Sequence, residues 1–229
     1  MVNAELLKLA ERFHGHICPF LVLGLRASEI AFEKLSLIKP GVYETISEDI
    51  VAIVEANNCF ADGVQIATGC TLGNNSLVYI DLGKNAVTIL KRYSGKGIRV
   101  YIDAERLDKY IPREARELFH KVVIERRGSR EEAEKLNEIW REIGLKMATL
   151  PEEEFKITEV EVTEEIERAP IFESIRCSRC GELAMSTRVV YIEGKPYCLT
   201  CAGMGTNAVI GRGIVTGVRT PYRISKVEK

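Results

Sequence analysis

Apolar residues recur at a helical spacing in three segments of the first part of the chain. Residues 3–13 and 19–36 each place apolar side chains on one helical face, and Pro19 suits the first turn of the second helix. A third helix is predicted from about Cys59 to Gly69, because glycine is a common residue just past a helix end.

Runs rich in apolar and β-branched residues predict five strands. Residues 49–56 have the composition of a buried strand. Three further segments, joined by short turns that carry glycine or asparagine, predict an antiparallel meander over residues 76–81, 85–92 and 97–103. The last strand of the core is predicted at residues 155–162.

Two more helices are predicted between the meander and the last strand. Pro112 opens one that continues to about Arg126. Ser129 caps the other, with Glu132 at the capping-box position, and this helix continues to about Met147. The elements together predict an α+β fold in which an antiparallel sheet is packed with helices.

The composition changes near residue 165. The preceding stretch is strongly acidic, whereas glycine, cysteine and arginine become frequent after residue 172 and long apolar stretches disappear. We therefore predict a core domain at residues 1–165, a linker at 163–172, a small four-cysteine zinc ribbon at 173–205 and a tail at 206–229.

Charge and hydropathy exclude some functions for the chain as a whole. The net charge of −1 gives no general attraction to nucleic acid or membranes, although residues 171–229 carry nine Lys/Arg against four Asp/Glu. No apolar run approaches the roughly 18 residues of a membrane span. Because the N-terminus is amphipathic and charged, we expect a cytoplasmic protein with reduced cysteines.

Four cysteines form two close pairs in the second domain. Cys177 and Cys180 make one C-x2-C pair, and Cys198 and Cys201 make the other after seventeen intervening residues. Four thiolates in this pattern satisfy the tetrahedral preference of Zn²⁺, and such a closed site is structural. Two disulfides or an iron–sulfur centre are the alternatives. A domain this small depends on the metal for its folding energy.

Three cysteines lie outside the ribbon, and each stands beside glycine, histidine or asparagine: Cys18, Cys59 and Cys70. On a helix, Cys59, Asp62 and Gln65 share one face. Cys59 lies at the helix start, where unpaired N–H groups favour a thiolate. Asp62 on the same face is suited to orient a ligand or to accept a proton.

The segment FHGHICPFLVLGLRA, followed by NNCFADGVQIATGCTLGNNS, resembles the family of the formylmethanofuran dehydrogenase E subunit. Some members of that family carry a C-terminal zinc ribbon, so the resemblance spans nearly the whole chain. It implies an α+β core that dimerises and a pocket, lined by the His–Cys segment and the Cys–Asp helix, that can hold a metal. It also implies an association with formylmethanofuran chemistry, and hence with methanogenesis, in archaea.

The residues themselves suggest how a core metal would be held. His16 and Cys18 form an H-x-C pair, and Cys59 brings a third ligand, which together suit Zn²⁺ or another transition metal with an open position. One alternative is a metal-free catalytic site in which Cys59 is the nucleophile, His16 its base and Asp62 an orienting group. Another is a structural turn in which His14 and His16 bond backbone carbonyls.

Three functions are compatible with these features. The first is a metal-binding accessory or stand-alone protein, a homodimer or a partner of formylmethanofuran dehydrogenase subunits. The chain has no ferredoxin-like cysteine run, dinucleotide glycine pattern or P-loop, so we expect redox cofactors on other chains. The second is a ligand-sensing regulator whose basic ribbon binds nucleic acid. The third is a small metal-dependent hydrolase or transferase.

Overall fold

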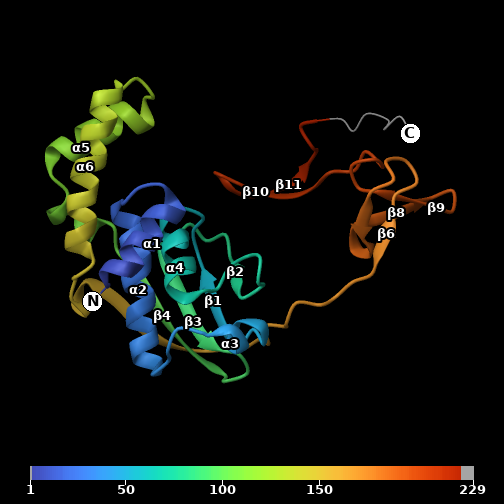
Figure 1. Ribbon diagram of the computed structural model, residues 1–229, viewed down its shortest axis with the longest axis horizontal. Helices are drawn as coiled ribbons and strands as arrows, with labels where there is room; N and C mark the ends of the chain where they lie inside the picture. The colour runs from blue at the N-terminus through green and yellow to red at the C-terminus, as the bar shows by residue number, and fades with distance from the viewer. Residues whose placement is uncertain (1, 223–229) are drawn as a thin grey trace. The chain divides into compact units, whose positions relative to one another are not determined.

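The computed structural model describes residues 2–222, and the chain divides into two compact units at the Arg168–Ala169 bond. The first unit holds a sheet covered by helices, and the second holds three short hairpins (Figure 1). The predicted α+β class with a small four-cysteine unit is confirmed. The predicted linker from residue 163 is divided by this boundary, because its first residues pack with the core unit.

The sheet of the first unit has five strands in the order β2-β1-β3-β4-β5, and all neighbours are antiparallel except β1 and β2. The strands are β1 (Ile50–Val54), β2 (Leu77–Tyr79), β3 (Ala86–Lys91), β4 (Lys96–Ile102) and β5 (Phe155–Glu161). Strands β1 and β3 are buried along almost their whole length, which explains their unbroken apolar sequences.

The predicted meander is wrong at its first strand. Strand β2 does not pair with β3, because β1 lies between them and pairs with both. The helix that follows β1 carries the chain across the sheet, so β2 returns parallel to β1 on its outer edge. The second turn of the predicted meander is a true hairpin, since β3 and β4 pair antiparallel.

The helices of the first unit lie close to their predicted bounds. They are α1 (Ala4–His14), α2 (Pro19–Leu35), α3 (Val42–Ile46), α4 (Cys59–Thr68), α5 (Arg113–Phe119) and α6 (Arg130–Met147), with short turns η1 (Glu105–Tyr110), η2 (His120–Ile124) and η3 (Glu152–Glu154). The helix predicted from Pro112 to Arg126 is divided into α5 and the π-helical turn η2. No helix within residues 2–222 is long and apolar enough to cross a membrane.

Helices α2 and α4 pack against each other beside the sheet (Figure 1). They approach most closely at Gly24 and Gly63. A Cβ atom added to Gly24 would lie 2.2 Å from the carbonyl oxygen of Phe60, and one added to Gly63 would lie 2.1 Å from that of Leu21. The two backbones therefore touch, which only glycine allows. This contact fixes the beginnings of both helices relative to each other, and these beginnings carry Cys18 and Cys59.

The second unit consists of small antiparallel hairpins. They pair β6 (Ser174–Arg176) with β7 (Leu183–Met185), β8 (Val189–Ile192) with β9 (Lys195–Cys198), and β10 (Thr206–Ile210) with β11 (Gly213–Val218), and the turn η4 (Ser186–Arg188) joins the first two hairpins. The part of the predicted tail that the structure describes thus forms a hairpin, and the rest, residues 223–229, lies outside the described residues.

Candidate metal centres

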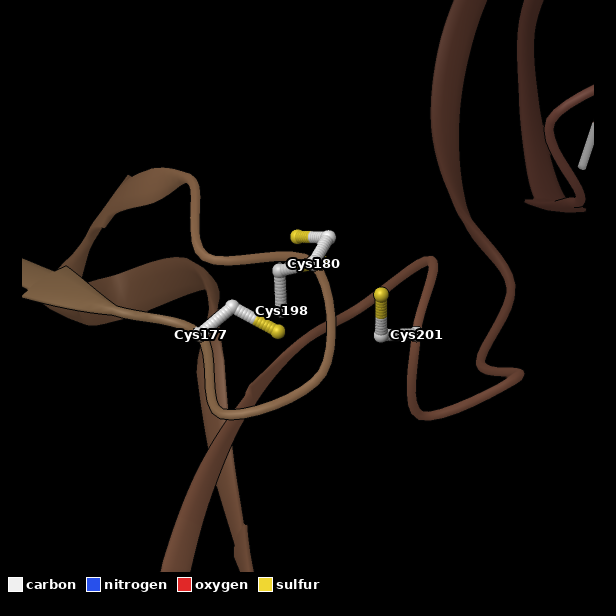
Figure 2. A group of neighbouring side chains, drawn as sticks. All are labelled: Cys177, Cys180, Cys198 and Cys201. Carbon is white, nitrogen blue, oxygen red and sulfur yellow. The ribbon is translucent and has the colours of Figure 1, made fainter. Parts of the chain in front are cut away.

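The four cysteines of the second unit converge on one point. Cys177 and Cys180 lie on the turn after β6, and Cys198 and Cys201 lie at the end of β9 (Figure 2). Their sulfur atoms all lie within 4.8 Å of one another, and none is in a disulfide. Among the described side chains of this unit, only that of Cys177 is buried, so no conventional apolar core holds the hairpins together.

Backbone N–H groups favour the thiolate form of Cys177. Burial by itself raises the pKa of Cys177, but the N–H groups of Cys180, Cys198 and Arg179 outweigh it and lower the pKa to about 6. The first turn is closed by its own hydrogen bond, which the N–H of Gly181 donates to the carbonyl of Cys177. Four convergent thiols with backbone donors fit a structural Zn²⁺.

A second cluster lies in the first unit, where α1 ends and α2 begins. One ligand atom from each of His14, His16 and Cys18 lies within 4.8 Å of the others. His14 is the last residue of α1, and Gly15 follows with a left-handed backbone, φ +92°, that ends the helix and turns the chain. Cys18 is the N-cap of α2. The tight connection between two helices therefore gathers these three side chains.

Asp62 of α4 fixes the orientation of His14. The His14 Nδ1 atom lies 2.7 Å from the Asp62 carboxylate, and Gln65 donates to the other carboxylate oxygen at 3.3 Å. With Nδ1 donating to Asp62, the lone pair of His14 is on Nε2, which lies 3.9 Å from the Cys18 sulfur. A carboxylate behind a histidine is the usual arrangement at protein metal sites.

Cys59, the first residue of α4, forms a pair with Cys18. The thiol of Cys18 donates to the sulfur of Cys59, and this bond together with burial raises the pKa of Cys18. The same hydrogen bond, with smaller contributions from His14, lowers the pKa of Cys59 to about 6 despite its burial. Cys59 is thus the thiolate of the pair.

Aromatic rings connect the cluster to α6 and α5. The rings of His14 and His16 have centroids 4.6 Å apart, and His16 stacks on Trp140 at 5.9 Å and 24°. Trp140 in turn contacts Phe119 at 5.7 Å. Burial, followed by the charge of His14, lowers the pKa of His16. A neutral imidazole is the form that binds metals.

A cavity of about 380 Å³ lies beside this cluster. Its wall is formed by the beginnings of α2 and α4 on one side and by α5, η2 and α6 on the other. The lining residues are Cys18, Pro19, Phe20, Asn58, Cys59, Ile111, Ala115, Arg116, Phe119, His120, Ile124 and Trp140. This volume is within the range of small-molecule sites in proteins.

The structure brings some of the predicted site residues together and leaves others apart. It brings Cys18 next to Cys59 and His16 next to His14, but the three-residue cluster contains His14 where the sequence suggested Cys59. His14 also lies within reach of Cys59, the place that the catalytic alternative gave to His16. Cys70 lies apart, buried against β1, where its thiol donates to the carbonyl of Ile50.

Sequence reasoning missed two parts of the site. One is the role of His14, which the sequence suggested only for a structural turn, whereas its Nδ1 atom lies 2.7 Å from the Asp62 carboxylate. The other is the far wall of the cavity, including His120 and Trp140, which come from elements far along the chain. No local pattern marked those side chains.

A solved structure shares this fold. It is the crystal structure of a protein from Syntrophus aciditrophicus that is like the E subunit (FmdE) of tungsten formylmethanofuran dehydrogenase, with a TM-score of 0.56 and 23% sequence identity. The similarity covers 87% of this chain and 91% of that chain. At this level of identity the comparison concerns the fold alone.

A curated relative is much closer in sequence. A probable S-adenosyl-L-methionine-binding protein of Archaeoglobus fulgidus is 59% identical over 211 residues, which cover 92% of this chain and 56% of the relative. The chain thus spans about half the length of that protein.

Two family models match the two units. The C-terminal match, over residues 170–203, is the prokaryotic dksA/traR C4-type zinc finger, and it contains all four clustered cysteines. The larger match covers residues 13–156. This range includes the core cluster of His14, His16 and Cys18 and also Trp140 on the cavity wall. Its family is described as FmdE, molybdenum formylmethanofuran dehydrogenase operon. Because this match exceeds half of the chain, the protein belongs to the FmdE family and carries a C4-type zinc finger after its core.

Proposed function

We propose that the protein binds two metal ions of different roles. The zinc finger holds a structural Zn²⁺ on Cys177, Cys180, Cys198 and Cys201, and the core holds a transition metal on His14, His16 and Cys18. The observation that carries the core site is the separation of 3.9 Å between the His14 Nε2 and Cys18 Sγ atoms. Two ligands of a tetrahedral Zn²⁺, with bonds of about 2.0 and 2.3 Å, lie about 3.6 Å apart.

The donor set favours zinc or a similar borderline metal. Two imidazoles and one thiolate suit Zn²⁺ better than the hard cations, which prefer oxygen ligands. The metal at this position would act as a Lewis acid with one coordination position left for water or a ligand. The chain's own residues do the rest: Asp62 orients His14, burial keeps His16 neutral, and Cys59 lines the cavity beside Cys18.

This arrangement supports an accessory or stand-alone role for the protein in one-carbon chemistry of the formylmethanofuran type. Its core offers a ligand-accepting metal beside a cavity, and we infer that electron-carrying cofactors reside on partner subunits. We also expect a cytoplasmic location, because the free thiols at both proposed sites require a reducing compartment. The family resemblance adds the expectation of a homodimer.

Elemental analysis of the purified full-length chain tests this proposal. We expect about two metal equivalents per chain, falling to about one in His14→Ala and in His16→Ala while the finger retains its zinc. Cys59→Ala should keep about two equivalents, because Cys59 is not among the proposed ligands. His120→Ala is the matched control, because His120 lines the cavity but is not in the cluster. One equivalent in every protein would disprove the core metal.

S-adenosyl-L-methionine is a second candidate ligand. The relative of Archaeoglobus fulgidus bears it in its name, and the aromatic wall of the cavity, with Trp140 and Phe119, offers a surface on which an adenine ring can stack. Equilibrium dialysis with labelled S-adenosyl-L-methionine tests this idea directly. Binding that is unchanged in Trp140→Ala would place the ligand elsewhere on the chain.

A further inference from the structure

The cavity of the first unit shares a wall with the core cluster. Cys18, one of the three clustered residues, lines the cavity, and so does its neighbour Cys59. His16, a second member of the cluster, stacks on Trp140, which lines the same cavity. A molecule in this cavity would therefore lie against the metal proposed for the core.

The remaining wall is apolar. It is built from Phe20, Ile111, Ala115, Phe119, Ile124 and Trp140. Phe119 and Ile124 are 39% and 59% exposed, so both present apolar area to water on the cavity wall. Covering them with a bound apolar group would remove this area from water, and that transfer is favourable. The wall thus selects a ligand with a hydrocarbon or aromatic body.

The cationic groups on the wall are already paired. Arg116 donates to the backbone carbonyls of Asp108 and Ile111, and it forms an ion pair with the Asp108 carboxylate at 3.4 Å. His120 faces the Glu125 carboxylate at 3.5 Å. Within the described lining of the cavity, a carboxylate or phosphate would therefore find no unpaired cation to compensate its charge.

The metal itself sets the chemistry of the ligand's head group. A divalent ion bound by two neutral imidazoles and the Cys18 thiolate would carry about +1, and the Cys59 thiolate beside Cys18 offsets this charge. Softness rather than charge therefore selects the head group, and a sulfur donor matches a metal that already has a cysteine ligand. Carboxylates are harder donors, and they are favoured where oxygen ligands dominate.

We propose that the cavity binds an apolar thiol whose sulfur coordinates the core metal and whose body lies against Trp140 and Phe119. On binding, the thiol would lose its proton to the solvent, and its sulfur would take the coordination position that His14, His16 and Cys18 leave open. This inference rests on the core metal of the proposed function. It adds the chemical class of the ligand, which the four-cysteine finger, with no open position, cannot bind.

Four probes separate the contributions of head group and body. The zinc-loaded full-length chain is titrated anaerobically with phenylmethanethiol, 2-mercaptoethanol, phenylmethanol and phenylacetate. The readout is the fluorescence of Trp140, the chain's single tryptophan. Phenylmethanethiol should bind about tenfold or more tighter than each of the others, because only it has both the soft donor and the aromatic body.

A cavity variant localises the binding. Phe119→Ala should weaken phenylmethanethiol about fivefold without changing the metal content, since it removes apolar wall but no ligand atom. Leu145→Ala is the matched control, because Leu145 is similarly exposed on α6 and does not line the cavity. Equal weakening in both variants would overturn the proposal.

Other outcomes would also overturn it. If 2-mercaptoethanol binds as tightly as phenylmethanethiol, the apolar wall contributes nothing to binding. If phenylmethanol binds as tightly, the bond between sulfur and metal contributes nothing. If thiols bind only in Cys59→Ala, Cys59 itself fills the coordination position in the natural protein. Elemental analysis distinguishes the two proposals: a chain with a core metal but no thiol response refutes the thiol ligand alone, whereas a chain without the core metal refutes both.

Discussion

The two clusters of metal-binding side chains are built in opposite ways. The finger draws its four cysteines from two short turns in a unit that has almost no buried apolar side chains among its described residues. The core cluster draws on the ends of α1 and α2, is oriented by α4, and lies within a unit that has a continuous apolar core. The finger therefore depends on a metal to fold, whereas the proposed core site is already formed by packing, so a metal there would be available to a ligand.

Removing the finger's metal should have the largest effect. Structural Zn²⁺ in such peptides contributes about 10–16 kcal/mol of apparent binding free energy, so Cys177→Ser should unfold the second unit. Limited proteolysis of the full chain, analysed by mass spectrometry, should then show new cleavage confined to the second unit, from residue 169 onward. Ser178→Ala, one residue away, is the control and should stay resistant. Cleavage that spreads equally into residues 2–168 would contradict the independence of the two units.

Filling the contact between α2 and α4 should be the next largest effect. Gly63→Ala places a Cβ atom only 2.1 Å from the Leu21 carbonyl oxygen, and forcing packed backbones apart costs on the order of 1–3 kcal/mol or more. We expect a lower urea midpoint, followed by the fluorescence of Trp140, and reduced core metal content. Gly73→Ala, whose added Cβ meets only the Thr71 hydroxyl at 3.8 Å, should change neither quantity.

Neutralising Asp62 should have an intermediate effect that is confined to the core. Asp62→Asn removes the charge that holds the His14 imidazole in its tautomer, and such changes weaken metal affinity about 10–100-fold. A competition titration with a zinc chelator measures the loss, and the finger's affinity serves as the internal reference. Asp81→Asn, whose carboxylate accepts from Tyr79, should leave both affinities unchanged.

Alkylation of the metal-free chain should show the smallest but most local difference. The pKa of Cys59 is lowered to about 6, so its thiolate is present above that pH and is lost as the pH falls through it. The rate of iodoacetamide labelling at the Cys59 peptide should therefore reach half its maximum near pH 6. Cys70, which is buried with a raised pKa, should label far more slowly. If the labelling rate of Cys59 reaches half its maximum near the pKa of a free cysteine, its assignment as the thiolate of the pair is wrong.

The sequence predicted the secondary structure of the core well where the signals were local. Proline at the start of α2, glycine after α4 and the Ser129–Glu132 capping box all mark ends that the structure confirms. The order of the strands in the sheet could not be predicted from local sequence patterns. Whether residues 76–81 paired with the following strand or with β1 depended on the path of α4 across the sheet, and apolar periodicity does not encode that path.

The same distinction separates the four-cysteine finger from the proposed core site. The spacing of Cys177, Cys180, Cys198 and Cys201 determines the finger almost by itself, because a two-residue gap forms a turn that points both sulfurs one way. The choice among the ligands of the core, by contrast, was decided by tertiary structure. The glycine contact between α2 and α4 sets how near Cys59 comes to Cys18, and Asp62 reaches His14 only because α1 packs on α4. Spacing along the chain sets the distances between residues that are close in the sequence. The distance between two helices depends instead on the size of the side chains packed between their backbones.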